Sequence, residues 1–261
     1  MPVIDSHGCP IDVEVTGPEN APVLMLSSSL GTTKHMWDPQ MDAFAKQCRV
    51  VRYDRRGHGK SGVPKGPYNM EMLGRDVIAI MDGLKIDKLN WLGLSMGGME
   101  GMWLGANAGN RIDKLILSNT SSHYADKSMW HTRMDAVGKA GSVAGISDMV
   151  INAWLTKDFQ TAQPDTTARM KEMMISTPVE GYLACCAAVR DMDHRKILRE
   201  IKVPTLIIAG SKDPATNVAA AEFIRDRIPG SKLAIVEAAH IANVEVPDEY
   251  ARVVLNFLGS K

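Results

Sequence analysis

The chain has 261 residues with 30 basic and 30 acidic side chains, so its formal net charge is zero. Hydrophobic residues make up 45% and charged residues 23%, which is typical of a globular protein and excludes a wholly disordered chain. The charge balance argues against a broad basic surface for nucleic acid. No apolar run approaches the length of a membrane-spanning helix. We therefore expect neither a nucleic-acid partner nor a membrane partner.

Six short apolar runs are predicted to be buried strands. In chain order they are residues 23–27, 49–53, 88–93, 114–118, 204–209 and 232–236. Apolar residues at helical spacing lie between most of them, at residues 70–84, 219–228 and 249–258. Strands that alternate with helices of this length predict βαβ units and a mostly parallel sheet. Residues 3–15, with His7-Gly8 between two extended runs, predict a hairpin at the sheet edge.

The regular alternation breaks between residues 121 and 195, which show helical patterns and no convincing strand. This predicts an all-helical insertion between the fourth and fifth strands. The expected organisation is an α/β core of residues 1–120 and 196–261, with residues 121–195 as a cap. A helical insertion above the carboxyl ends of the strands would cover a ligand crevice.

The cysteines and the N-terminus point to a cytoplasmic protein. Cys9, Cys48, Cys185 and Cys186 have the spacing of neither a zinc site nor a disulfide framework, so we expect buried reduced thiols. The first residues lack the charged and apolar regions of a secretory signal. The sequence does not determine the oligomeric state.

Residues 93–97 read Gly-Leu-Ser-Met-Gly and come directly after the third predicted strand, with a helix-forming run behind them. G-x-S-x-G in a strand–turn–helix context predicts a sharp turn that presents its serine at the top of the sheet. Glycines are needed there because side chains at the flanking positions would clash. The following helix aims free N–H groups at the same place. Ser95 is therefore the predicted nucleophile.

A serine hydroxyl needs a base to take its proton and an acid to orient that base. His240 lies just after the last predicted strand, at the carboxyl edge of the sheet, whereas the other histidines after Ser95 fall in or beside the insertion. Asp213 lies in a turn after the fifth strand, and the rival position after the fourth holds Asn119. Asp213 and His240 complete the predicted triad. The predicted oxyanion donors are the backbone N–H groups of Met96 and Leu30.

Four segments together resemble the α/β-hydrolase superfamily. They are residues 54–61 (Asp-Arg-Arg-Gly-His-Gly-Lys-Ser), residues 93–97, Gly210-x-x-Asp213 and Ala239-His240. The resemblance runs from residue 3 to residue 258 and implies an α/β-hydrolase fold, with a mostly parallel central sheet, helices on both faces and a helical cap. Members of that superfamily usually carry His-Gly where this chain has Ser28-Ser29.

Several segments resemble the 3-oxoadipate enol-lactonases of aromatic catabolism, namely residues 28–32 with 36–40, 53–61, 181–191 and 239–245. That resemblance implies hydrolysis of 3-oxoadipate enol-lactone to 3-oxoadipate in the β-ketoadipate pathway, through an acyl-enzyme. Ser95, Asp213 and His240 occupy the triad positions, and Leu30 and Met96 occupy the oxyanion positions. No metal or organic cofactor is required.

A small anionic lactone needs a cation or directed N–H donors in its pocket. Arg133 is the first candidate, because it lies three residues after Trp130 on one helix face of the insertion. Arg190 is the second candidate, and Trp154 could form an apolar wall. The ordinary alternatives are solvated arginines and a tryptophan that only packs within the insertion. His58 is expected to be a structural loop residue.

Other functions stay open from the sequence alone. Within the same fold, a carboxylesterase or a C–C bond hydrolase would use the same triad. A haloalkane dehalogenase is disfavoured, because it would need a carboxylate where Ser95 stands. A small-molecule receptor with an intact triad is the alternative outside enzymes, and turnover without a partner protein would separate the two.

Overall fold

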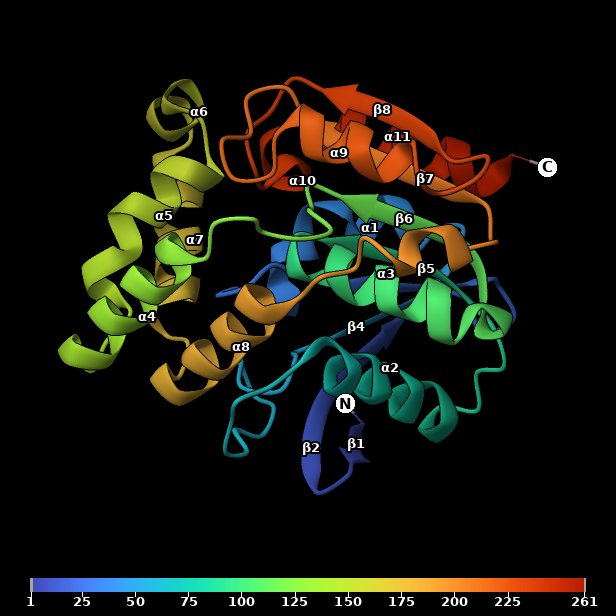
Figure 1. The fold of residues 1–261 in the computed structure, drawn as a ribbon. Coiled ribbons are helices and arrows are strands. Elements are labelled where there is room, and N and C mark those ends of the chain that lie inside the picture. The colour runs from blue at the N-terminus through green and yellow to red at the C-terminus, as the bar shows by residue number, and fades with distance from the viewer. Residues whose placement is uncertain (1, 261) are drawn as a thin grey trace.

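A single mixed sheet forms the centre of the computed structural model, which describes residues 2–260 (Figure 1). Among these residues, eight strands lie in the order β1-β2-β4-β3-β5-β6-β7-β8. The strands are β1 (Val3–Ser6), β2 (Cys9–Thr16), β3 (Val23–Ser27), β4 (Arg49–Tyr53), β5 (Leu89–Leu94), β6 (Ile112–Ser118), β7 (Thr205–Gly210) and β8 (Lys232–Val236). All six strands predicted from apolar runs are confirmed, with ends that differ by no more than two residues.

The sheet is parallel from β4 to β8 and antiparallel at its β1 edge. β1 pairs with β2 in antiparallel register, and β2 pairs antiparallel with β4, which confirms the predicted edge hairpin. The turn between β1 and β2 places His7 at φ 52° and Gly8 at φ 81°. β5 and β7 are buried at every position because helices cover both faces of the sheet, and this explains their uninterrupted apolar runs.

Helices cover both faces of this sheet. Outside residues 121–195, they are α1 (Met41–Phe44), α2 (Met70–Gly83), α3 (Met96–Asn107), α9 (Val218–Arg225), α10 (Ala242–Glu245), α11 (Pro247–Gly259) and the 3-10 turns η1 (Lys34–Gln40), η2 (Gly109–Arg111) and η4 (Ile197–Glu200). α3 packs on β5 and β6 with α2 beside it, whereas α1 packs on β4 and contacts α11 (Figure 1). The predicted α/β-hydrolase architecture of a mostly parallel sheet between helical layers is confirmed.

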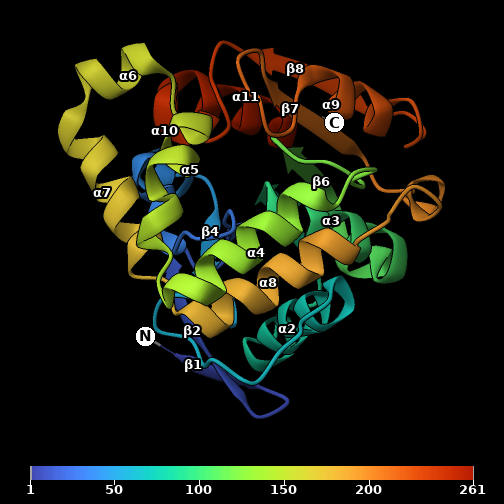
Figure 2. The ribbon, with the colours of Figure 1, turned by 60° about the vertical axis from the view of Figure 1, so that its left-hand side comes forward.

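All secondary-structure elements assigned within residues 121–195 are helices, as the sequence predicts. They are α4 (Ser128–Ala140), α5 (Ser147–Trp154), α6 (Lys157–Ala162), α7 (Pro164–Ile175), α8 (Val179–Asp191) and the 3-10 turn η3 (Ala144–Ile146). All of these residues are described, and their only β pairing is one bridge between His123 and Asp193. That bridge brings the two ends of the segment together. The helices lie beside the carboxyl ends of the parallel strands, with α4 along α8 (Figures 1 and 2).

A contact between two glycines joins α8 to the core. A Cβ on Gly181 would lie 2.1 Å from the backbone oxygen of Gly57, and a Cβ on Gly57 would lie 2.7 Å from Cα of Gly181. Neither position therefore has room for a side chain. Gly57 also has φ +79°, a left-handed conformation that glycine adopts at little cost.

Candidate active site

Ser95 sits on a strained turn between β5 and α3. Its backbone has φ 58° and ψ −114°, and its N–H donates to the carbonyl of Ser118 at 2.8 Å. A Cβ on Gly93 would lie 2.0 Å from the oxygen of Gly97, and a Cβ on Gly97 would lie 2.3 Å from the oxygen of Ser27. Only glycine fits at either place. The local sequence thus builds the turn that the G-x-S-x-G pattern predicts.

The structure brings the three residues of the predicted triad into one hydrogen-bonded row. Nε2 of His240 lies 2.9 Å from Oγ of Ser95, and Nδ1 of His240 lies 2.9 Å from Oδ2 of Asp213. Asp213 follows β7, and His240 lies in the turn between β8 and α10. All three side chains are buried. The arrangement allows His240 to accept a proton from Ser95 while Asp213 holds the ring in place.

Asp213 is fixed by a set of donors on both carboxylate oxygens. Oδ1 accepts from the backbone N–H groups of Ala215 at 2.8 Å and Thr216 at 3.0 Å. Oδ2 accepts from the Thr216 hydroxyl at 2.7 Å and from Nδ2 of Asn119 at 3.1 Å. Burial alone would raise the pKa of Asp213, but His240 and the two Thr216 donors hold that pKa well below its usual range. The carboxylate therefore stays ionised and can stabilise a positively charged imidazole.

Sequence reasoning missed the supporting residues Asn119 and Thr216. Asn119 occupies the rival acid position after β6, and its side chain also donates to the carbonyl of Ala239 at 3.1 Å. It thereby links the Asp213 turn to the loop that carries His240. The available signal was its place directly after β6, the strand next to β7. Thr216 could be found as a hydroxyl three residues after an aspartate in a turn.

The two expected oxyanion donors flank Ser95. Met96 is the first residue of α3, and the first N–H groups of a helix have no acceptor within the helix. Leu30 lies in the loop after β3 and lines the same cavity as Ser95. The neighbouring Gly31 N–H donates to Nε2 of His58 at 2.9 Å, so it is already engaged. The geometry thus favours Leu30 over Gly31 as the second donor.

A cavity of about 240 Å³ opens above Ser95, between the core and the helices of residues 121–195. It is lined by Ser29, Leu30, Ser95, Tyr124, Met129, Trp130, Arg133, Met149, Val150, Ala153, Trp154, Tyr182, Pro214, Ala215 and His240. Two of the three predicted substrate-binding residues, Arg133 and Trp154, are among them. Arg190 is not among the residues that line this cavity. Its side chain instead pairs with the carboxylate of Asp191, the next residue of α8, at 2.6 Å.

Arg133 brings a positive charge to this cavity. Its guanidinium carbon lies 4.9 Å from the ring centre of Trp130, one turn earlier on α4. Within residues 2–260, its buried Nε has no hydrogen-bond partner. The charge of this guanidinium at the cavity wall complements an anionic ligand.

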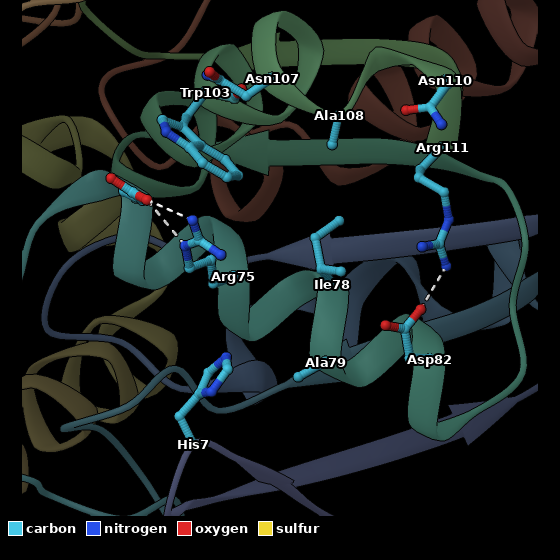
Figure 3. A pocket seen from close by; sticks show the side chains of 11 residues that line it. His7, Arg75, Ile78, Ala79, Asp82, Trp103, Asn107, Ala108, Asn110 and Arg111 are labelled. Atoms are coloured by element: carbon cyan, nitrogen blue, oxygen red, sulfur yellow. Dashed lines mark hydrogen bonds and ion pairs between the residues drawn. The ribbon is translucent and has the colours of Figure 1, made fainter.

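A larger groove of about 760 Å³ lies elsewhere, between α2 and α3 (Figure 3). Arg75 pairs there with Glu71 at 2.8 Å, and Arg111 pairs with Asp82 at 2.8 Å. Its cations are thus already neutralised, and none of the triad lines it. The smaller cavity above Ser95 is therefore the candidate active site.

Comparisons with known proteins identify the family. The family model described as alpha/beta hydrolase fold matches residues 22–247. The chain belongs to the α/β-hydrolase fold family. This α/β hydrolase has the mostly parallel sheet, the turn and the hydrogen-bonded row that its sequence predicts.

Its relatives include two proteins from Acinetobacter baylyi. The chain is 34% identical to 3-oxoadipate enol-lactonase 1 over 99% of its own length and 96% of the relative. It is 37% identical to 3-oxoadipate enol-lactonase 2 over 91% of its own length and 89% of the relative. Among solved structures, the enol-lactonase from Burkholderia xenovorans LB400 matches with TM-score 0.97 at 37% identity, covering 99% of this chain and 100% of that chain. The resemblance inferred from the sequence is confirmed.

Two further findings concern metal-binding side chains and membrane-spanning helices. Within residues 2–260, no group of three or more histidine, cysteine, aspartate or glutamate side chains is arranged to hold a metal ion. Across the same residues, none of the helices combines the length and the apolar character that crossing a membrane requires.

Proposed function

We propose that this α/β hydrolase opens 3-oxoadipate enol-lactone to 3-oxoadipate in the cytoplasm, as a step of the β-ketoadipate pathway. The observation that carries the proposal is the row Ser95–His240–Asp213, which ends in a cavity that Arg133 also lines. The enol-lactonase names of full-length relatives support the same substrate.

The first half of the reaction forms an acyl-enzyme. Nε2 of His240 takes the proton of Ser95 as Oγ attacks the lactone carbonyl. The N–H groups of Leu30 and Met96 stabilise the oxyanion of the tetrahedral intermediate. The carbonyl–oxygen bond of the ring then breaks, and the leaving oxygen departs as an enolate. An enolate is a weaker base than an alkoxide. It takes at carbon the proton that His240 holds, which gives the ketone, returns His240 to its neutral form and makes ring opening hard to reverse.

The second half releases the product. A water molecule gives a proton to His240 as its oxygen attacks the acyl carbon. The second tetrahedral intermediate collapses, the bond to Oγ of Ser95 breaks, and His240 returns the proton to the serine. The new carboxylate leaves with the product. The proton transfers to and from Ser95 pass through His240 while Asp213 stays ionised, and the new carboxylic acid loses its remaining proton to solvent.

Residues 121–195 are proposed to act as a cap on a core of residues 1–120 and 196–261. The cap supplies most of the cavity wall, including Trp130, Arg133 and Trp154. We assign Arg133 to the carboxylate of the lactone, because its Nε lacks a partner and its charge complements an anion. Trp154 would form an apolar wall opposite. The cap thus determines substrate choice, and the core performs the chemistry.

A turnover assay tests the proposed function. Freshly generated 3-oxoadipate enol-lactone is mixed with the protein, and loss of its ultraviolet absorbance is followed beside cleavage of p-nitrophenyl acetate. The expected result is rapid loss of the lactone, weak ester cleavage, and neither activity in Ser95→Ala. Good ester cleavage without lactone turnover would refute the lactonase assignment and favour a carboxylesterase. Turnover of neither substrate by folded protein would refute a hydrolase and favour a receptor.

A further inference from the structure

A buried ion pair lies beneath the loop of residues 28–31, which we call the oxyanion loop. Nε of Arg55 donates to Oε1 of Glu100 at 2.6 Å, and both residues are at most 4% exposed. Arg55 follows β4, whereas Glu100 lies on α3, about one turn after Met96. The pair therefore connects the neighbourhood of the oxyanion loop to the helix that carries the other expected donor.

Arg55 also holds two carbonyl groups of the oxyanion loop. Its Nη2 donates to the oxygen of Ser28 at 2.9 Å, and its Nη1 donates to the oxygen of Ser29 at 3.3 Å. The Thr32 hydroxyl donates to the same Ser29 oxygen at 2.8 Å. In a trans peptide the C=O and the next N–H point in opposite directions. Holding the Ser29 oxygen toward Arg55 therefore turns the Leu30 N–H away from Arg55.

His58 fixes the oxyanion loop from a second side. Its Nε2 accepts the N–H of Gly31 at 2.9 Å, so this ring nitrogen carries no proton. The ring is fully buried, and burial together with the charge of Arg55 lowers the pKa of His58 to about 3. His58 thus remains a neutral acceptor at working pH. The peptide on each side of Leu30 is held by a buried partner.

The Glu100 end of the pair is equally well anchored. Its Oε2 accepts from the Ser27 hydroxyl at 2.6 Å and from the Tyr53 hydroxyl at 2.9 Å. A buried ion pair is weak support for stability, since the cost of removing both charges from water offsets their attraction. Its geometric effect is more specific, because it joins the loop of one oxyanion donor to the helix of the other.

We propose that the Arg55–Glu100 pair sets the spacing and direction of the two oxyanion donors, Leu30 and Met96. Arg55 is then a positioning residue, which acts on the reaction through the Leu30 peptide and touches no substrate. The inference rests on the proposed hydrolysis by Ser95, because only that chemistry places an oxyanion between the two N–H groups.

The chain offers a matched control in the next residue. Nε of Arg56 donates to Oδ2 of Asp76 at 2.6 Å, and both residues are at most 6% exposed. This second pair joins the loop after β4, which also carries Arg55, to α2. Within residues 2–260, none of its side-chain hydrogen bonds reaches the oxyanion loop. Removing it tests the loss of a buried ion pair without disturbing the donors.

The experiment compares Arg55→Met/Glu100→Gln with Arg56→Met/Asp76→Asn, so that neither variant keeps an unpaired buried charge. The first readout is the rate at which a fluorophosphonate phosphonylates Ser95 with loss of fluoride, because its phosphoryl oxygen occupies the oxyanion position. The others are kcat and KM for p-nitrophenyl acetate, the pH profile of kcat/KM, and Tm.

For the Arg55 pair we expect labelling and kcat to fall by about 100-fold, the lower range for loss of one oxyanion donor. KM and the midpoint of the pH profile stay near the wild-type values, because the His240–Asp213 contact is untouched. The Arg56 pair loses a similar amount of Tm and keeps its labelling rate. If the Arg55 double variant is labelled as fast as the Arg56 control, this inference is overturned, while the proposed hydrolysis by Ser95 still stands.

Failure of the wild type to be labelled and failure of the double variant to fold have different consequences. If wild-type Ser95 does not react with the fluorophosphonate, the proposed hydrolysis fails and the inference fails with it. If the Arg55 double variant does not fold, Arg55→Lys replaces it, since an ammonium keeps the charge opposite Glu100 but cannot hold both carbonyls as a guanidinium does. Slow labelling at wild-type Tm is expected for Arg55→Lys, and a wild-type rate would refute the inference.

Discussion

Replacing Arg133 by methionine separates recognition of an anionic substrate from the chemistry at Ser95. Methionine keeps an unbranched apolar stem beside Trp130 but removes the charge and the free Nε–H. A hydrogen bond to a charged group contributes about 1.5–3 kcal/mol, which corresponds to about 10- to 150-fold in an equilibrium or rate ratio. We therefore expect kcat/KM for 3-oxoadipate enol-lactone to fall by about that factor in Arg133→Met.

The assay measures kcat/KM for the enol-lactone and for neutral p-nitrophenyl acetate on the same preparations. Ester cleavage should change little, because Arg133 does not touch the triad. Arg190→Met is the matched control, since Arg190 lies on the neighbouring helix α8 but pairs with Asp191 outside the cavity. Equal losses on both substrates in Arg133→Met, or an equal loss in Arg190→Met, would refute the assignment of Arg133 to the carboxylate.

Three other predictions concern stability, support of the triad and thiol reactivity. The unfolded chain protonates His58 near its usual pKa of 6.5, whereas the folded chain does so only near pKa about 3. The free energy of unfolding therefore decreases as the pH is lowered from 6.5 toward about 3, by at most about 1.4 kcal/mol per pH unit. Urea unfolding should show a shallower dependence on pH in His58→Gln, and identical slopes would contradict this. Asn119→Ala removes a donor from Asp213 and from the Ala239 carbonyl, so kcat should fall about 10-fold at unchanged KM; an unchanged kcat would show that the amide is dispensable. All four cysteines are buried, and burial raises the pKa of Cys186 to about 12, so a thiol reagent should titrate them only after unfolding, and rapid reaction of the folded protein would refute that view.

The architecture and the triad geometry were accessible from the sequence because each leaves a local pattern. Apolar runs separated by helical spacing predict the strands, since a parallel strand covered on both faces excludes polar residues. The 93–97 motif predicts its own turn, because the backbone approaches recorded at Gly93 and Gly97 allow no side chain. His240 and Asp213 follow from their places at the carboxyl ends of strands, where side chains of different strands meet.

The buried ion pairs were not accessible because they join residues that are distant in the chain and carry no motif. Arg55 and Arg56 are adjacent arginines in one loop, and only the fold directs one to Glu100 and the other to Asp76. The same limit applies to Arg190. The sequence offers both Arg190 on α8 and Arg133 on α4 as candidates for the substrate carboxylate, and only the fold separates them. The direction of Arg190 relative to the cavity depends on how the two helices pack together.

The contact between Gly57 and Gly181 restricts which segments can replace residues 121–195, the proposed cap. Because neither backbone leaves room for a Cβ at the contact, a cap exchanged from a relative would need glycine at the position that meets residue 57. The cavity-lining residues of α4 and α5 lie on other helices, so they can vary without touching this joint. The joint is thus separate from the cavity-lining positions on α4 and α5, whereas Tyr182, which also lines the cavity, directly follows Gly181 on α8. Substitutions on α4 and α5 can therefore reshape the cavity wall while the same joint holds the proposed cap.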